Sequence, residues 1–414
     1  MTAVTAADDS ALRRRLGTGD AVVIGLGSMV GAGIFAALGP AAAAAGAGLL
    51  LGLAIAAVVA YCNATSSARL AARHPQSGGT YVYGRERLGP FWGYLAGWSF
   101  VVGKTASCAA MALTVGYYVW PGAAHAVAVA AVVVLTVVNY TGVQKSALLT
   151  RVIVAFVLAV LAAVVVAVLG GAGGAERAPG VDVTVGGVLQ AAGLLFFAFA
   201  GYARIATLGE EVRDPARTIP RAIPIALGIA LVVYAAVAAA VLAGVGPAAL
   251  ASASAPLAEA VRDAGAPWLE PVVRVGAAVA ALGSLLALIL GVSRTTLAMA
   301  RDRHFPHALA AVHPTFGGPH RAEIAVGAVV AVLAAVVDLR GAIGFSSFAV
   351  LVYYAIANAA ALTLGHRIIP ILGLAGCIVL AFALPLPSVA AGVAVVVLGA
   401  AVYGVRRMSV RRAI

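Results

Sequence analysis

The feature that most constrains this chain is the recurrence of long, nearly uncharged apolar runs from one end to the other. A run of about 20 such residues is long enough to cross a bilayer as an α-helix. Only 10% of the residues are charged and 63% are hydrophobic, against roughly 25% charged in a soluble domain. The runs therefore predict an all-α polytopic membrane protein, since a membrane barrel would show short alternating strands instead.

The apolar runs predict about twelve transmembrane helices. They lie near residues 18–41, 43–68, 90–119, 122–140, 147–170, 187–211, 221–244, 270–298, 321–338, 342–363, 367–384 and 387–405. An even number of spans places both termini on one side of the membrane. Arginines cluster at both ends of the chain and in the loops of that same side, at positions that include 13–15, 406, 407, 411 and 412. The positive-inside rule therefore predicts that both termini are cytoplasmic.

Several function classes are excluded by the composition. The net charge of +12 does not indicate a nucleic-acid partner, because the charges lie between apolar runs and form no patch on a soluble face. The three cysteines form no CxxC pair, and no metal or cofactor is predicted. No nucleophile–base pair or phosphate loop indicates an enzyme. The first apolar run is followed by no cleavage site, so we expect it to be retained and not removed as a signal peptide.

Two of the predicted spans are interrupted. The first contains GLGSMVGAGIF (25–35), whose four glycines are costly in a continuous helix. The sixth contains FFAFAGYAR (196–204), a weaker signal with one glycine. Breaks five helices apart indicate two inverted five-helix repeats that meet at the membrane midplane. The freed backbone N–H and C=O groups suit a zwitterion. The alternative, that these glycines serve close helix packing, stays open.

Four motifs in order carry a family resemblance. They are GSMVGAGIF (27–35), PQSGGTYVYGRERLGPFWGYLAGW (75–98), FFAFAGYARIATLGEEVRDPARTIPRAI (196–223) and SRTTLAMARDRHFP (293–306). Through them the chain resembles the amino acid–polyamine–organocation superfamily of transporters. The resemblance implies a 5+5 inverted-repeat fold with broken helices 1 and 6, two extra C-terminal helices, and transport by alternating access.

The resemblance also implies a division of the chain. Residues 1–17 would form a short cytoplasmic tail, and 18–363 the inverted-repeat transport core. Within the core, repeat one covers about 18–170 and repeat two about 187–363. Residues 367–405 would form the two additional helices, and 406–414 a basic cytoplasmic tail.

Site residues follow from the same motifs. In the family, the substrate carboxylate binds amides of helix one, and the substrate ammonium binds carbonyls of helices one and six. The matching amides are those of Gly31, Ala32 and Gly33, the matching carbonyls are those of Met29, Phe197 and Ala200, and the gating position on helix eight is Leu288. Many relatives carry a hydroxyl residue where this chain has Ala32, so a contact there must come from the backbone.

One lysine lies near the middle of a predicted span. Lys104 is too deep in the third span to snorkel comfortably, while the helix-five lysine of many relatives is absent, with Val157 at about the matching position. We hypothesise that Lys104 faces the cavity and loses its proton during the transport cycle, which makes it the coupling candidate. The alternative of equal weight is a permanently charged lysine that binds freed backbone carbonyls.

Arg204 and Glu210 follow the break in the sixth span and are candidates for a gate or vestibule. The competing interpretation is that Arg204 is a snorkelling positive-inside residue and that Glu210 belongs to a solvated charge run.

The expected function is proton-coupled import of an amino acid. No carboxylate lies in the expected pocket, so we favour a neutral substrate, with an acidic one possible because of Lys104. Alternatives are an uncoupled amino acid exchanger and an amine or polyamine transporter. A channel or a non-transporting sensor is disfavoured, since a channel needs a continuous polar pore lining. The alanine- and arginine-rich composition indicates a bacterial plasma membrane; the oligomeric state is left open.

Overall fold

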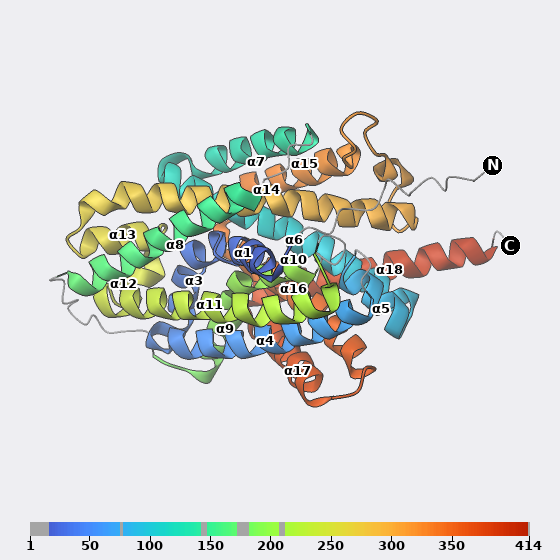
Figure 1. Cartoon of the computed structure of the whole chain (residues 1–414), viewed down its shortest axis with the longest axis horizontal. Helices are drawn as coiled ribbons and strands as arrows, with labels where there is room; N and C mark the ends of the chain where they lie inside the picture. The colour runs from blue at the N-terminus through green and yellow to red at the C-terminus, as the bar shows by residue number, and fades with distance from the viewer. Residues whose placement is uncertain (1–15, 75–77, 142–146, 172–181, 207–211, 413–414) are drawn as a thin grey trace, which may run out of the picture.

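The computed structural model describes residues 16–74, 78–141, 147–171, 182–206 and 212–412. Within these ranges the chain is helical, and the only β-type pairing is an isolated bridge between Leu16 and Val212. Most helices run along the long axis of the molecule (Figure 1). The prediction of an all-α polytopic protein is therefore confirmed.

The helices of the first half follow the expected runs closely. In chain order they are α1 (Thr18–Met29), α2 (Ala32–Ala36), α3 (Leu38–Ala45), α4 (Leu49–Arg73), α5 (Thr80–Leu88), α6 (Pro90–Val119), α7 (Ala124–Tyr140) and α8 (Ala147–Gly170). The nine-residue α5 is an addition to the expected spans, because it lies in the loop between the second and third of them.

The second half adds short helices between its spans. The elements are α9 (Val185–Phe199), α10 (Ala203–Ala206), α11 (Pro215–Gly244), α12 (Pro247–Ser252), α13 (Pro256–Asp263), α14 (Glu270–Arg301), α15 (His320–Val336), α16 (Leu339–Leu362), α17 (Ile368–Ala383) and α18 (Leu386–Arg412). Prolines at the first helical positions fix the starts of α6 and α11, where the missing N–H costs nothing.

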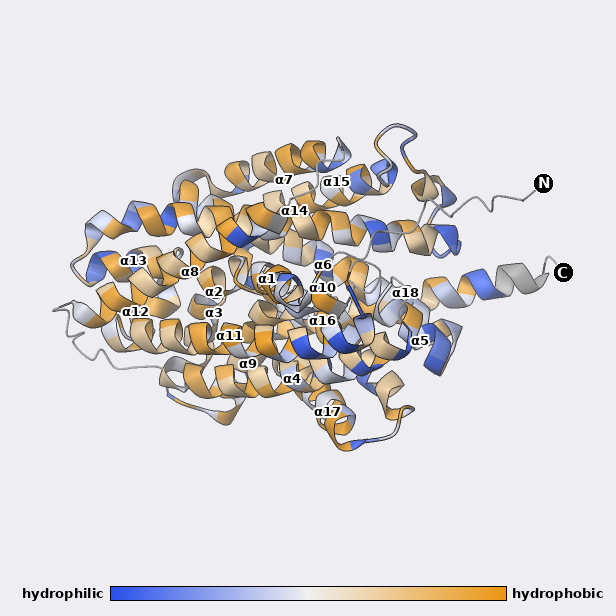
Figure 2. Cartoon of the chain, viewed as in Figure 1, coloured by the Kyte–Doolittle hydropathy of each residue, from blue (hydrophilic) through white to orange (hydrophobic). Residues whose placement is uncertain are grey.

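Ten helical stretches of the described chain are long and apolar enough to cross a bilayer. The remaining two of the twelve expected spans are shorter helices, α15 with 17 residues and α17 with 16. Large apolar side chains are exposed on the outer helices, among them Val134, Val166, Val332, Phe382 and Val397. Such a surface is suited to lipid. Hydrophilic residues gather where α5 lies and α18 ends, with apolar residues between the two ends of the bundle (Figure 2).

Several helices pack against one another at the centre of the bundle. α6 packs against α14 and α16, and α1 packs against α11 and α8. In Figure 1, α7 with α15 and α4 with α17 lie on opposite outer sides, and α1, α6 and α16 lie between them. The division into two repeats and two additional helices stays a prediction.

Candidate functional site

The first predicted break is present between α1 and α2. α1 ends at Met29, Val30 and Gly31 are not helical, and α2 starts at Ala32. A Cβ atom on Gly31 would lie 2.1 Å from Ser284 Oγ, and one on Gly33 would lie 2.5 Å from the Cα of Ala198. The glycines thus serve close packing against α14 and α9 and lie at the break, while the substrate site stays a prediction.

The second break is a tightened turn. α9 ends at Phe199, Ala200–Tyr202 form a 3-10 turn, and α10 continues from Ala203. A Cβ atom on Gly201 would lie 2.2 Å from the carbonyl oxygen of Ser28. Only a glycine allows the two broken helices to approach this closely.

A tyrosine from a third helix joins the two breaks. The hydroxyl of Tyr234, on α11, lies 2.6 Å from the carbonyl oxygen of Met29 and 3.1 Å from that of Ala198. The Tyr234 side chain is fully buried. Buried carbonyls need a donor, and Tyr234 supplies it to both helices. The sequence offered no sign of this contact, because Tyr234 is one tyrosine in an otherwise ordinary apolar span.

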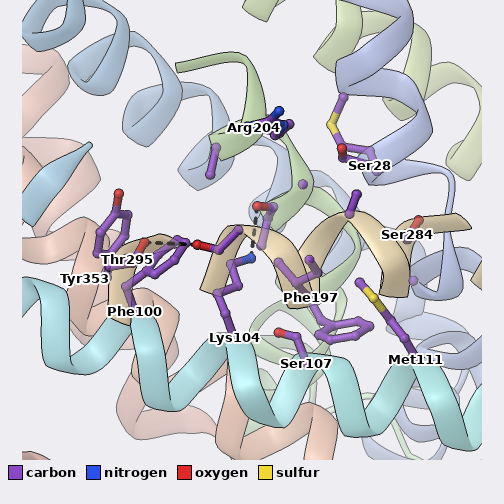
Figure 3. A pocket seen from close by; sticks show the side chains of 18 of the residues that line it. Ser28, Phe100, Lys104, Ser107, Met111, Phe197, Arg204, Ser284, Thr295 and Tyr353 are labelled. Atoms are coloured by element: carbon purple, nitrogen blue, oxygen red, sulfur yellow. Dashed lines mark hydrogen bonds between the residues drawn. The ribbon is translucent and has the colours of Figure 1, made fainter. Parts of the chain in front are cut away.

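A cavity of about 210 Å³ lies beside the two breaks. Most predicted site residues line it: Met29, Ala32, Gly33, Lys104, Phe197, Ala200, Arg204 and Leu288. Gly31 does not line it, and Glu210 lies outside the described residues. Figure 3 shows the side chains of Lys104, Phe197 and Arg204 around this space.

Other lining residues were not singled out from the sequence. Tyr81 comes from α5, Phe100 and Met111 from α6, Arg294 from α14 and Tyr353 from α16. A signal was available for α6 alone, because Phe100 and Met111 share a helical face with Lys104. No comparable spacing relates Arg294, Tyr81 or Tyr353 to the predicted residues.

Lys104 contacts the second break. Its side chain is 6% exposed, and its ammonium donates a hydrogen bond of 3.2 Å to the carbonyl oxygen of Ala200. A dashed line from Lys104 marks this hydrogen bond in Figure 3. This is the contact that the carbonyl-binding interpretation expects. Two of the three carbonyls predicted to receive a substrate ammonium, those of Met29 and Ala200, therefore already accept a hydrogen bond from the protein.

A hydrogen-bonded junction joins three helices at one end of the bundle. The hydroxyl of Tyr118 donates a 2.9 Å hydrogen bond to the carbonyl oxygen of Phe35 and accepts one of 3.3 Å from the amide of Leu257. These residues join α6, α2 and α13, and none of them lines the cavity. Toward the other end of the bundle the cavity is lined by Arg294, which is exposed.

A polar cluster lies where α5 meets the end of α14. The hydroxyl of Tyr81 hydrogen-bonds to the carboxylate of Asp302 and lies 3.0 Å from Nδ1 of His304, while Arg85 forms a 3.1 Å ion pair with Asp302. Burial and the Asp302 charge raise the pKa of Tyr81. Burial lowers the pKa of His304. The cluster ties α5 to the end of α14 and places the Tyr81 ring on the cavity wall.

The described part of the chain contains no group of three or more His, Cys, Asp or Glu side chains that could hold a metal ion.

The chain is similar to known membrane transport proteins. The family described as amino acid permease matches residues 16–405. An uncharacterized transporter of Mycobacterium tuberculosis is 76% identical over 411 residues, which cover 97% of this chain and 93% of that protein. A branched-chain amino acid permease of Bacillus subtilis is 26% identical over 355 residues, 80% of this chain and 76% of the relative. A chloroplastic cationic amino acid transporter of Arabidopsis thaliana is 29% identical over 399 residues, 87% and 67% of the two chains.

Proposed function

Because the chain belongs to the amino acid permease family, we propose that this multi-pass membrane protein moves an amino acid across a bilayer by secondary active transport with alternating access. The observation that carries the proposal is the cavity at two helix breaks, lined by residues of both. Carriers of this kind bind their substrates at broken helices. In the proposal the Tyr118 junction with Phe35 and Leu257 closes one side, and exposed Arg294 lies toward the side that is open.

The substrate would bind at the breaks. Its carboxylate would meet the amides of Gly31, Ala32 and Gly33, and its ammonium the carbonyls of Met29, Phe197 and Ala200, with Leu288 as the gate on α14. The carbonyl of Ala200 can receive an ammonium when Lys104 releases it or through its second lone pair. Arg204 lines the same cavity and would form its vestibule, with Glu210 as a further candidate.

The coupling ion in this proposal is the proton, and Lys104 carries it. A lysine buried at a midplane break exchanges its proton far more readily than an exposed one. An uncoupled exchanger is the second candidate, favoured by the hydrogen bond that Lys104 already makes with Ala200. An amine or polyamine is disfavoured as substrate, because no carboxylate among the described residues lines the cavity. The protein would act in a bacterial plasma membrane with both termini cytoplasmic, and without catalysing a reaction.

Cysteine accessibility tests alternating access. After Cys62, Cys108 and Cys377 are replaced by alanine, a Leu288→Cys variant in oriented vesicles is treated with a membrane-impermeant thiol reagent from each side. Leu285→Cys, on the same helix but fully buried away from the cavity, is the matched control.

Alternating access predicts that Leu288→Cys reacts from the side where α5 lies and is protected by a transported amino acid, while Leu285→Cys stays unreactive. Reaction of Leu288→Cys that a transported amino acid leaves unchanged, from either side, would contradict the proposal.

A further inference from the structure

All charged side chains that line the cavity in the described chain are cations. They are Lys104, Arg204 and Arg294, and no aspartate or glutamate joins them. Arg204 also interacts with another group. Lys104, which is buried, and Arg294, which is exposed, are the two other positive charges of the cavity wall.

Among the described residues, the partner of Lys104 is a neutral group. Its ammonium has three donor hydrogens, and it donates a hydrogen bond to the carbonyl oxygen of Ala200. It forms no ion pair with any described carboxylate. A cation at this depth is costly unless an anion pairs with it. An anionic ligand in the same cavity would remove that cost.

Arg294 extends the positive charge to the surface. It lines the cavity from α14 and is exposed. Its charge acts on Glu323, but that carboxylate makes no ion pair with it and does not line the cavity. A cleft with charges of one sign and low-dielectric walls concentrates ions of the opposite sign. The cavity entrance thus favours anions over zwitterions and cations.

We propose that the substrate is an acidic amino acid, whose side-chain carboxylate pairs with the Lys104 ammonium; the inference rests on the proposed transport function. An acidic amino acid would replace the hydrogen bond between Lys104 and Ala200 at the second break. Its side-chain carboxylate pairs with the Lys104 ammonium, and its own ammonium then donates to the Ala200 carbonyl. A neutral amino acid supplies no carboxylate for Lys104, and a dicarboxylate without an amine leaves the carbonyl unpaired.

The pairing also couples substrate release to the proton. On the open side, an N–H bond of the Lys104 ammonium breaks, the electron pair stays on Nζ, and the proton passes to water. The carboxylate then loses its charged partner and leaves. Cys108 acts on Lys104 from the same helix, and the other titratable or charged groups that line the same cavity are Tyr81, Tyr353, Arg204 and Arg294. One substrate of charge −1 moving with one proton carries no net charge, whereas a neutral amino acid with one proton carries +1.

The experiment is counterflow and uptake in proteoliposomes with labelled L-glutamate, L-aspartate, succinate, L-alanine, L-leucine and L-lysine. Initial rates are measured at a fixed proton gradient, with and without an inside-negative potassium-diffusion potential. The variants are Lys104→Met, Lys104→Arg and Arg294→Gln. Arg301→Gln is the matched control, because Arg301 is exposed on the same helix and does not line the cavity. Each variant is checked for a monodisperse gel-filtration profile.

We expect counterflow of glutamate or aspartate, with rates that the potential leaves unchanged. Lys104→Met should lower the rate by about tenfold or more, because a charge-assisted hydrogen bond is lost, and Lys104→Arg should restore part of it. Arg294→Gln should raise the KM for the acidic substrate, and Arg301→Gln should not.

Three results would overturn the inference. Transport of alanine, leucine or lysine but not of acidic amino acids would refute the substrate class and leave the transport proposal intact. Acidic uptake that Lys104→Met leaves unchanged would refute the role of Lys104. Succinate transported as fast as glutamate would refute the exchange of partners at Ala200. If no labelled amino acid enters vesicles that hold folded protein, the proposed function itself fails.

Discussion

The ammonium of Lys104 lies 3.2 Å from the carbonyl oxygen of Ala200, where α9 gives way to the 3-10 turn Ala200–Tyr202. This contact joins the one charged residue in the middle of α6 to the break in the sixth span. The break and the charge state of the lysine are therefore linked, because an ammonium is a much stronger donor to a carbonyl than a neutral amine.

Loss of the Tyr234 hydroxyl should destabilise the paired breaks. Tyr234→Phe leaves the carbonyl oxygens of Met29 and Ala198 without the donor they share. Leaving a buried acceptor unsatisfied costs about 1–3 kcal/mol, so we expect a lower thermal midpoint in detergent. Tyr61→Phe is the control, since Tyr61 is 50% exposed on α4. Equal midpoints for Tyr234→Phe and the parent protein would show that the bridge contributes nothing.

A methyl group at position 201 should separate the two broken helices. The added Cβ would lie 2.2 Å from the Ser28 carbonyl oxygen, and its nearest neighbours are all backbone atoms of Ser28 and Met29, which cannot move aside as a side chain can. Gly201→Ala is therefore expected to abolish transport and lower the yield of folded protein. Gly228→Ala, where no atom lies within 4 Å of the new Cβ, should be neutral or slightly stabilising, as alanine is a better helix former. Wild-type uptake by Gly201→Ala would contradict the close approach of the breaks.

The contact of α5 with the end of α14 should weaken as pH falls. Burial holds the pKa of His304 below its unfolded value of about 6.5. Above that pH both states are neutral and the contact is fully present; below it the opened state takes up the proton more readily, and stability is lost. Asp302 opposes this shift, whereas Arg85 and Arg406 support it. Hydrogen–deuterium exchange in α5, corrected for the intrinsic rate, should therefore rise between about pH 7 and pH 5.5.

Two histidine variants separate His304 from other groups. His304→Gln should flatten this pH dependence, and His307→Gln, at an exposed position in the same loop, should leave it as in the parent protein. If hydrogen–deuterium exchange in α5 depends on pH in His304→Gln as it does in the parent protein, a group other than His304 titrates.

The ion pair at the same end offers a test independent of pH. Arg85 and Asp302 join α5 to the end of α14 over 3.1 Å, and Tyr81 bonds to the same carboxylate. Asp302→Asn should raise exchange in α5 over the whole pH range, because it removes the shared acceptor charge. The pair is more than one-third exposed, so the loss of global stability should be small. Unchanged exchange would show that the cluster does not hold α5.

Much of the architecture could be predicted because hydrophobic length and glycine placement are local signals. The spans and the first break followed from runs such as GLGSMVGAGIF, and most residues that the motifs singled out line the cavity. The sixth-span break gave a weak signal, since its single glycine is required by the Ser28 carbonyl of another helix. The role of Tyr234 could not be predicted, because Tyr234 lies 205 residues along the sequence from the residue whose carbonyl it binds.

The hydrogen-bond partner of Lys104 could not be predicted from the sequence either. The position of Lys104 within its span indicates that it lies deep in the membrane and needs an acceptor for its hydrogen bonds. Which carbonyl accepts depends on how α6 packs beside the turn at Ala200, and the sequence leaves both interpretations of the lysine open. The Tyr81 cluster was hidden for a further reason, because α5 is a short helix in a segment expected to be a loop.

The most direct test of the account is proton-driven uptake by the parent protein and Lys104→Ala in liposomes. Labelled amino acid is supplied outside, with an inward proton gradient or none, and with internal amino acid present or absent. The account predicts concentrative uptake that needs the gradient in the parent protein and is lost in Lys104→Ala. Uptake that needs only internal amino acid, with the same pH dependence in both proteins, would make this an uncoupled exchanger and leave Lys104 a structural role.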